Sequence, residues 1–211
     1  MATETREKIL ETARVLFNEH GLNRVGIRDI ARATKISPGN LSYHFATKDA
    51  LVAALVMRLH EVNAETIFTK LPDTFSLETL YRSAVAVMRN ILGYRFVLLS
   101  YVDAVRVSDE LQRLQAVLRV RHDRRSTMMC ELLVKNGYVT RAVLAARYMA
   151  EQSSMISSGW LNAAAFHPEL RTDDAVILHY AKVGCALLEP YCTPKGKRQM
   201  RRILAGDLDG G

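Results

Sequence analysis

The stretch that decides the fold is IRDIARATKISPGNLSYHFATKDAL, residues 27–51. Ile27 and Ile30 lie at helical spacing and predict a short helix. Ser37 followed by Pro38 is typical of a helix start, because the hydroxyl caps free amides and proline has no amide to leave unpaired. Two short helices joined by a tight turn are the anatomy of a helix-turn-helix motif.

Basic residues accompany this motif. Between residues 24 and 48 the chain carries five basic residues against Asp29 alone. The second helix of such a motif enters the DNA major groove, so we expect Asn40 to bond base edges and Tyr43 to bond phosphates. Lys48, at the next helix start, is expected to hold a phosphate. The alternative is a helical core turn with a solvated charged face. The candidate DNA-binding residues are Arg28, Lys35, Ser37, Pro38, Gly39, Asn40, Ser42, Tyr43, His44 and Lys48.

The rest of the chain also predicts helices. Apolar residues recur at helical spacing, and no stretch alternates as a half-buried strand does, so the fold class is all-α. The expected helices cover a first segment ending at His20 and then about 48–70, 77–92, 94–105, 108–135, 141–165, 173–189 and 194–205.

Composition excludes several other classes of protein. The chain has 211 residues, of which 49% are hydrophobic and 24% charged, as in ordinary globular proteins. No apolar run is long enough to cross a bilayer and the first residues lack the core of a signal peptide, so we expect a cytoplasmic protein with no membrane partner. The net charge of +7 permits nucleic-acid binding.

Catalytic and metal-binding motifs are absent from the sequence. Cys130, Cys185 and Cys192 are widely spaced, and no Cys/His cluster has zinc-ligand spacing. There is no Gly-rich phosphate loop and no Gly-x-Ser-x-Gly motif. We therefore expect no catalytic residues, no metal and no cofactor.

The motif carries a family resemblance. The run Gly39-x-Leu41-x-Tyr43-His44-Phe45-x-x-Lys48-x-x-Leu51, within residues 6–55, resembles the TetR family of bacterial transcriptional regulators. The resemblance implies a homodimer that binds a palindromic operator in double-stranded DNA, a repressor that a small-molecule effector releases. A DNA-binding factor without an effector, or an activator, remains the alternative.

The resemblance also implies a division into domains. Residues 1–47 would form the helix-turn-helix DNA-binding domain. Residues 48–205 would form the helical domain for ligand binding and dimerisation, with residues 48–70 as the connecting helix. Residues 206–211 would be a flexible tail.

Three residues depart from the usual pattern of the family. Gly26 stands where Ser or Thr usually caps the second helix, and it offers no side-chain bond. Lys35 stands where the turn usually has glycine, so a left-handed backbone there costs about 1 kcal/mol. Ser42 replaces an aromatic residue. These changes make the base preference harder to predict than the fold.

The C-terminal part contains a candidate effector pocket. His122 and Arg125 fall on a helix stripe where leucine is expected, which suggests a polar pocket for an anionic ligand group; a solvated basic face is the alternative. The other candidates are apolar and also fit an ordinary core. The candidate ligand-binding residues are Met88, Leu92, Phe96, Leu99, His122, Arg125, Met129, Met155 and Trp160.

The candidate dimer surface lies on the last long helices. Residues 153–159 are mostly Ser and Gly, which lets another helix approach closely, and Trp160 is a residue type favoured at interface centres. Together with the helix at 173–189 they predict a contact of four helices across a two-fold axis.

Overall fold

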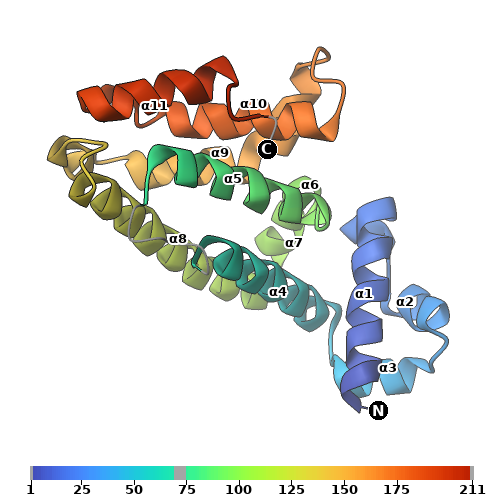
Figure 1. Ribbon diagram of the computed structural model, residues 1–211. Helices are drawn as coiled ribbons and strands as arrows, with labels where there is room; N and C mark the ends of the chain where they lie inside the picture. Colours follow the sequence, from blue (N-terminus) through green and yellow to red (C-terminus); the bar gives the residue numbers. More distant parts are fainter. Residues whose placement is uncertain (1, 69–74, 210–211) are drawn as a thin grey trace. The chain divides into compact units, whose positions relative to one another are not determined.

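The computed structural model describes residues 2–68 and 75–209 and consists of helices joined by short turns (Figure 1). In this described part there is no strand, and Val139 and Cys192 form an isolated antiparallel bridge. The all-α prediction is confirmed. The helices are α1 (Ala2–His20), η1 (Leu22–Arg24), α2 (Ile27–Thr34), α3 (Pro38–His44), α4 (Lys48–Phe68), α5 (Leu77–Leu92), α6 (Phe96–Leu99), α7 (Tyr101–Val107), α8 (Asp109–Lys135), η2 (Arg141–Ala145), α9 (Met149–Ala163), η3 (Ala164–Phe166), α10 (Asp173–Ala186), η4 (Glu189–Tyr191) and α11 (Pro194–Ala205).

The chain forms two compact units. The first comprises residues 1–63 and 90–117, and the second comprises residues 64–89 and 118–211. The chain passes from one unit to the other within α4, α5 and α8. None of the helices in the described part is long and apolar enough to cross a membrane.

The first unit contains a head made of α1, α2 and α3. Its core is apolar: Phe17 of α1, Ile30 of α2 and Leu41 of α3 are each fully buried. Burying a side chain of this size stabilises the fold by roughly 1.5–3 kcal/mol, so the three helices hold one another. Cation–π contact adds to this packing, because the Arg6 guanidinium lies 5.0 Å from the centre of the Phe45 ring.

A backbone carbonyl just after α5 fastens α1 to the rest of the first unit. The carbonyl oxygen of Gly93 accepts hydrogen bonds from the Arg14 guanidinium and, at 2.8 Å, from the Asn18 amide. The Asn18 carbonyl oxygen accepts in turn from the backbone N–H of Phe96, at 3.2 Å. The rings of Phe17 and Phe96 pack with their centres 5.4 Å apart. We call these contacts of Arg14, Phe17 and Asn18 the α1 clamp.

Ser100, one helical turn after Phe96, makes a second set of bonds to the head and interrupts the helix predicted at 94–105. The Ser100 hydroxyl donates to the carbonyl of Phe96 at 3.1 Å and accepts from the N–H of Leu22 at 3.2 Å. Ser100 has φ −142° and ψ −6°, which no α-helix permits. The single helix predicted at 94–105 is therefore wrong: it divides into α6 and α7 at Ser100, whose hydroxyl is bonded to Leu22 far away in the sequence as well as to Phe96.

In the second unit, α9 begins later than the sequence predicts. Residues 141–145 form only the 3₁₀ turn η2, in which Val143 alone is buried, and α9 begins at Met149 and not at residue 141. The bridge at Val139 and an extended Ala146, with ψ 96°, hold this segment away from a continuous helix. Gly196 of α11 passes so close that an added Cβ would lie 2.0 Å from the Tyr138 carbonyl oxygen, so only glycine fits there.

The predicted flexible tail is wrong for residues 206–209. Gly206 ends α11 in a left-handed conformation with φ 88°. The Asp209 carboxylate then accepts from the Tyr81 hydroxyl and from the Lys182 ammonium, each at 2.6 Å, and these two bonds keep the pKa of Asp209 low despite its desolvation. Residues 210 and 211 lie outside the described residues.

We expect Asn18→Ala to weaken the α1 clamp. The variant loses the bonds to Gly93 and Phe96 and leaves a partly buried N–H unpaired, which costs about 1–3 kcal/mol. The free energy of unfolding in urea measures this loss. Asn23→Ala is the matched control, because Asn23 is exposed in η1 and its loss should change the free energy by less than about 0.5 kcal/mol. Equal effects of the two substitutions would contradict the clamp.

Candidate nucleic-acid interface

The turn between α2 and α3 is built by local bonds. Gly26 precedes α2 with φ −101° and has no side chain to cap the helix, but its own N–H donates to the Asp29 carboxylate at 2.9 Å, which is the other half of a capping box. Lys35 ends α2 with φ 60° and ψ 45°, the left-handed conformation expected where the family usually has glycine. Such a conformation costs a non-glycine residue about 1 kcal/mol, which the surrounding structure must offset.

The start of α3 is capped as predicted. The Ser37 hydroxyl accepts from the backbone N–H of Asn40 at 3.1 Å, and Pro38 stands in the first helical turn. Leu41 is 0% exposed and Phe45 4%, so these two side chains anchor α3 in the head. This anchoring leaves the opposite face of the helix in solvent.

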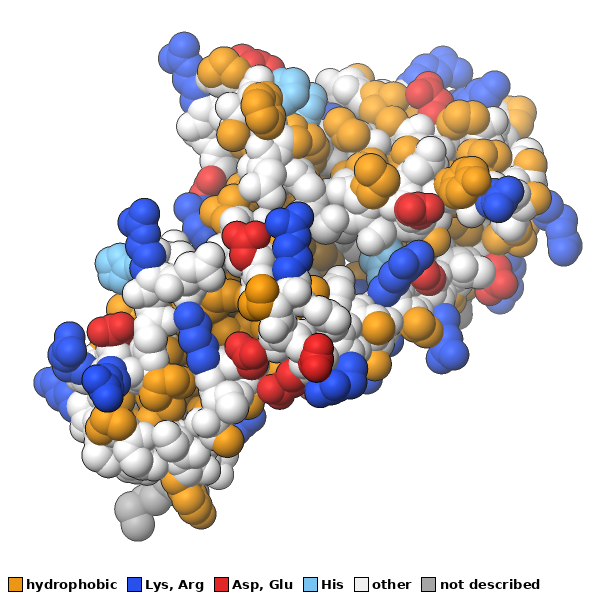
Figure 2. All heavy atoms as spheres, turned by 180° about the vertical axis from the view of Figure 1, so that it is seen from behind, with side chains coloured by type: hydrophobic (Ala, Val, Ile, Leu, Met, Phe, Trp, Pro, Cys, Tyr) orange, Lys and Arg blue, Asp and Glu red, His pale blue; other side chains and the backbone are white. Residues whose placement is uncertain are grey.

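Most of the predicted DNA-binding residues are exposed, and those on α3 other than the half-buried His44 belong to its open face. Tyr43 is 82% exposed although it is aromatic, and its ring stands 5.3 Å from that of His44. Figure 2 shows Lys and Arg side chains on the surface of the head. His44 and Lys48 are half-buried. The exposed members of the predicted set are Arg28, Lys35, Ser37, Pro38, Gly39, Asn40, Ser42 and Tyr43.

Lys48 is engaged within the head. Its ammonium donates to the carbonyl of Leu22 at 2.6 Å and lies 5.8 Å from the centre of the Phe17 ring. Burial lowers the pKa of Lys48, against the opposing charge of Asp49. Because an ammonium has three donors, the bond to Leu22 still leaves donors for a phosphate. The sequence pointed to a phosphate role and gave no sign of this brace.

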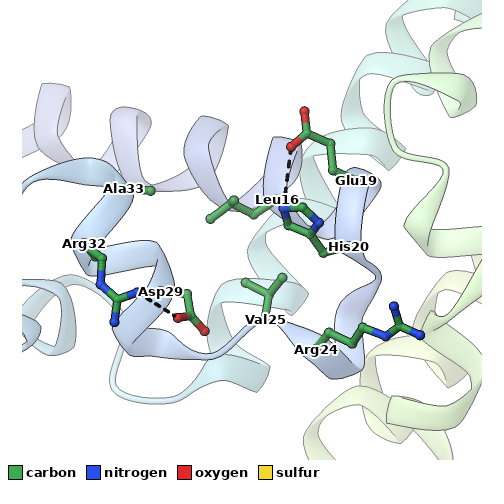
Figure 3. Close-up of a pocket in the computed structure, with 8 residues that line it drawn as sticks. All are labelled: Leu16, Glu19, His20, Arg24, Val25, Asp29, Arg32 and Ala33. Atoms are coloured by element: carbon green, nitrogen blue, oxygen red, sulfur yellow. Dashed lines mark ion pairs between the residues drawn. The ribbon is translucent and has the colours of Figure 1, made fainter.

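A hollow lies beside the motif, between α1 and α2 (Figure 3). It has a volume of about 480 Å³ and an apolar floor that includes Leu16 and Val25. Charged side chains of both signs stand around it, among them the ion pair of Arg32 with Asp29 at 3.7 Å. The full lining is Leu16, Glu19, His20, Arg24, Val25, Asp29, Arg32 and Ala33, and the sequence gave no sign of it.

The predicted ligand-binding residues divide between the two units. Leu92, Phe96 and Leu99 belong to the first unit and the other six to the second. Leu99 is 52% exposed and Met155 68%, so neither lines an interior in this chain. Leu92 and Met129 are half-buried, as are His122 and Arg125, whereas Met88, Phe96 and Trp160 are buried. No group of three or more metal-ligating side chains is found within residues 2–68 and 75–209.

Two descriptions of protein families match the sequence. The family described as bacterial regulatory proteins, tetR family, matches residues 9–55, and the description bacterial transcriptional repressor matches residues 60–200. The HTH-type transcriptional regulator UidR of Escherichia coli K12 is 29% identical over 94 residues, which cover 44% of this chain and 48% of UidR. The chain spans about half the length of the curated relatives it matches.

Solved structures share the fold. A TetR-family regulator from Marinobacter aquaeolei VT8 superimposes with a TM-score of 0.78 at 20% identity, covering 95% of each chain. The SmeT–triclosan complex superimposes with a TM-score of 0.68 at 21% identity, covering 90% of this chain and 93% of SmeT. With the two sequence matches spanning most of residues 9–200, the chain belongs to the TetR family of bacterial regulatory proteins.

Proposed function

We propose that the chain is a transcriptional repressor that binds a palindromic operator as a homodimer and leaves it when a small-molecule effector binds. The observation that carries the proposal is the exposed polar face of α3, held outward by the buried Leu41 and Phe45. Residues 1–47 would be the DNA-binding domain, and residues 48–205 the effector and dimer domain. We propose no catalytic activity and a place in the cytoplasm.

The exposed face of α3 suits the major groove. Asn40 is exposed at the capped N-terminal end of the helix, where residues of a recognition helix meet bases, and its amide can bond adenine at two atoms. Tyr43 on α3 and Arg28 on α2 are also exposed. Their side chains suit contacts with DNA phosphates, which set the position of the protein along the duplex. The similarity to UidR, an HTH-type transcriptional regulator, supports DNA as the partner of this chain.

The dimer proposal uses α9 and α10. Met155 is 68% exposed and Val183 38%, so apolar groups on these two packed helices meet solvent in the single chain. Ser158 on α9 is also exposed, and its side chain is small enough to let a helix of a second copy approach closely. Trp160, by contrast, is 1% exposed and packs inside its own chain, so it does not serve as the centre of an interface.

The effector would act through α5. This helix begins in the second unit and ends in the first, directly before Gly93. The α1 clamp holds that glycine, so a displacement of α5 reaches α1 and the head. SmeT, a structural neighbour, is described in complex with the small molecule triclosan, which supports an effector here. The second candidate is a DNA-binding factor without an effector, or an activator. The geometry of α3 and α5 is the same for these proteins as for an effector-released repressor.

Asn40→Ala tests the reading of bases. Loss of a bidentate contact should weaken binding to the operator by about 1–3 kcal/mol and leave binding to random DNA nearly unchanged. DNA upstream of the chain's own gene serves as the operator in a gel-shift titration. Gln115→Ala on α8, an exposed polar side chain outside the head, is the control. Equal losses on both DNAs would reduce Asn40 to a positioning residue.

Lys48→Met separates the two roles of Lys48. Removing one phosphate contact should reduce the slope of log K against log salt by about 0.9, whereas Lys197→Met, an exposed cation of α11, should leave the slope unchanged. Fluorescence anisotropy at several salt concentrations measures the slope. If the slope of Lys48→Met is unchanged while its stability falls, Lys48 is only the brace that holds Leu22.

Gly159→Glu tests the dimer surface. A Cβ added at Gly159 meets nothing within 4 Å in the single chain, so the substitution should leave the fold intact and oppose only a second copy. We expect monomers by sedimentation, with normal helix content by circular dichroism and loss of operator binding. Gln115→Glu adds the same charge at an exposed site of α8 and should remain dimeric. A dimeric Gly159→Glu with normal DNA binding would place the interface elsewhere.

A further inference from the structure

Leu22 is held by side chains from two distant parts of the chain. Its backbone N–H donates to the Ser100 hydroxyl at 3.2 Å, and its carbonyl accepts from the Lys48 ammonium at 2.6 Å. Ser100 stands 78 residues and Lys48 26 residues from Leu22 in the sequence. All three residues belong to the first unit. Leu22 therefore joins the junction of α6 and α7 to the start of α4.

The turn η1 needs these two side chains, because it is too short to pair its own backbone. The first N–H groups and the last carbonyls of a helix have no partner within the helix, and η1 comprises three residues. Gly21 before it supplies no side-chain cap. The Leu22 side chain is 1% exposed and anchors the residue in the head. One buried side chain and two bonds to the backbone thus fix Leu22 from three directions.

Ser100 is itself fixed, so it can serve as an anchor. Its backbone N–H and its hydroxyl both donate to the carbonyl of Phe96, at 2.9 Å and 3.1 Å. Phe96 is 1% exposed, and its ring packs against that of Phe17. A serine hydroxyl has one hydrogen, and here Phe96 takes it. Towards Leu22 the hydroxyl therefore acts only as an acceptor.

The Lys48 ammonium is ordered by Leu22 before any DNA arrives. A lysine side chain loses much rotamer freedom when it is fixed in one place. Here the bond to Leu22 and the ring of Phe17, 5.8 Å away, already restrict the ammonium in the free protein. Two N–H groups of the ammonium remain for a phosphate. Binding then costs less entropy than it would for a freely moving lysine.

We propose that Ser100 is a positioning residue for DNA binding: through Leu22 it holds the Lys48 ammonium in place for a phosphate of the operator. The inference rests on the proposed function, because it includes the phosphate contact of Lys48. Ser100 lies outside residues 1–47 and acts through the backbone of Leu22 without touching the DNA. The junction of α6 and α7 is thus part of the DNA-binding machinery.

Ser100→Ala tests this role through the salt dependence of operator binding. Weakening the Lys48 contact should lower the slope of log K against log salt by about 0.5–0.9, and the affinity near ~0.15 M salt about two- to fivefold. Ser100→Thr keeps the hydroxyl and should restore both values. Fluorescence anisotropy at several salt concentrations measures them. A wild-type slope in Ser100→Ala, even with a lower Tm, would make Ser100 a merely structural residue and overturn the proposal.

Thr127→Ala is the matched control for Ser100→Ala. The Thr127 hydroxyl on α8 also donates to the carbonyl four residues earlier, that of Asp123 at 3.0 Å. Thr127 belongs to the second unit, away from Leu22 in the first. Its loss should leave the slope and the affinity as in the wild type. An equal fall of the slope in Thr127→Ala would overturn the link through Leu22.

A double variant shows whether Ser100 acts through Lys48. If it does, Ser100→Ala combined with Lys48→Met should bind the operator no more weakly than Lys48→Met alone. Residues that act through one contact give non-additive losses, whereas independent residues give additive ones. Additive losses in this cycle would therefore overturn the proposal.

The Lys48 ammonium also gives a readout without DNA. Its ¹H–¹⁵N NMR signal, assigned by its absence in Lys48→Met, should be visible in the wild type and in Ser100→Thr, because the group is half-buried and bonded. In Ser100→Ala the signal should disappear, since a released ammonium exchanges its protons rapidly with water. An unchanged signal in Ser100→Ala would overturn the positioning role.

The two readouts distinguish this inference from the proposed function. If the signal changes as expected but no DNA is bound, Ser100 positions Lys48 and the repressor function fails. If Lys48→Met lowers the slope whereas Ser100→Ala changes neither the slope nor the signal, the phosphate contact stands and the positioning role fails.

Discussion

The carbonyl of Gly93 is the constraint on which the head depends. It accepts from two side chains of α1, Arg14 and Asn18, at the point where α5 ends. Asn18 then binds the next turn through Phe96, and the Ser100 hydroxyl extends the connection to Leu22. These bonds join the C-terminal end of α5 and the turn after it to the last turns of α1 and to η1.

Local chemistry explains what the sequence could predict. The cap at Ser37 depends on residues within four positions, so the local sequence contains the information needed. The left-handed Lys35 was expected only from the place of glycine in the resembled family. The buried Leu41 and Phe45 follow from helical spacing. Once these two side chains define the buried face of α3, helical geometry also defines which residues of this short helix are exposed.

Long-range contacts explain what the sequence could not predict. The break at Ser100 depends on the N–H of Leu22, 78 residues away in the chain, and the late start of α9 depends on a bridge from Val139 to Cys192. No local pattern contains either partner. Leu99 shows the consequence: an apolar residue on a predicted continuous helix was expected inside, but the break leaves it 52% exposed. His122, in an unbroken helix, lies on the stripe where spacing put it.

If the chain responds to an effector as proposed, energetics favour a clamp that stays closed with and without the effector. An effector shifts the head only by the difference between its affinities for the two states. Reversing a 99:1 population takes about 5.5 kcal/mol, most of the roughly 8.2 kcal/mol that a micromolar ligand releases. Breaking the bonds of Arg14 and Asn18 would consume part of that difference at about 1 kcal/mol each, whereas a clamp that remains intact transmits a movement of α5 without this loss. Contacts that only one of the two states makes with the ligand are where the difference in affinity arises.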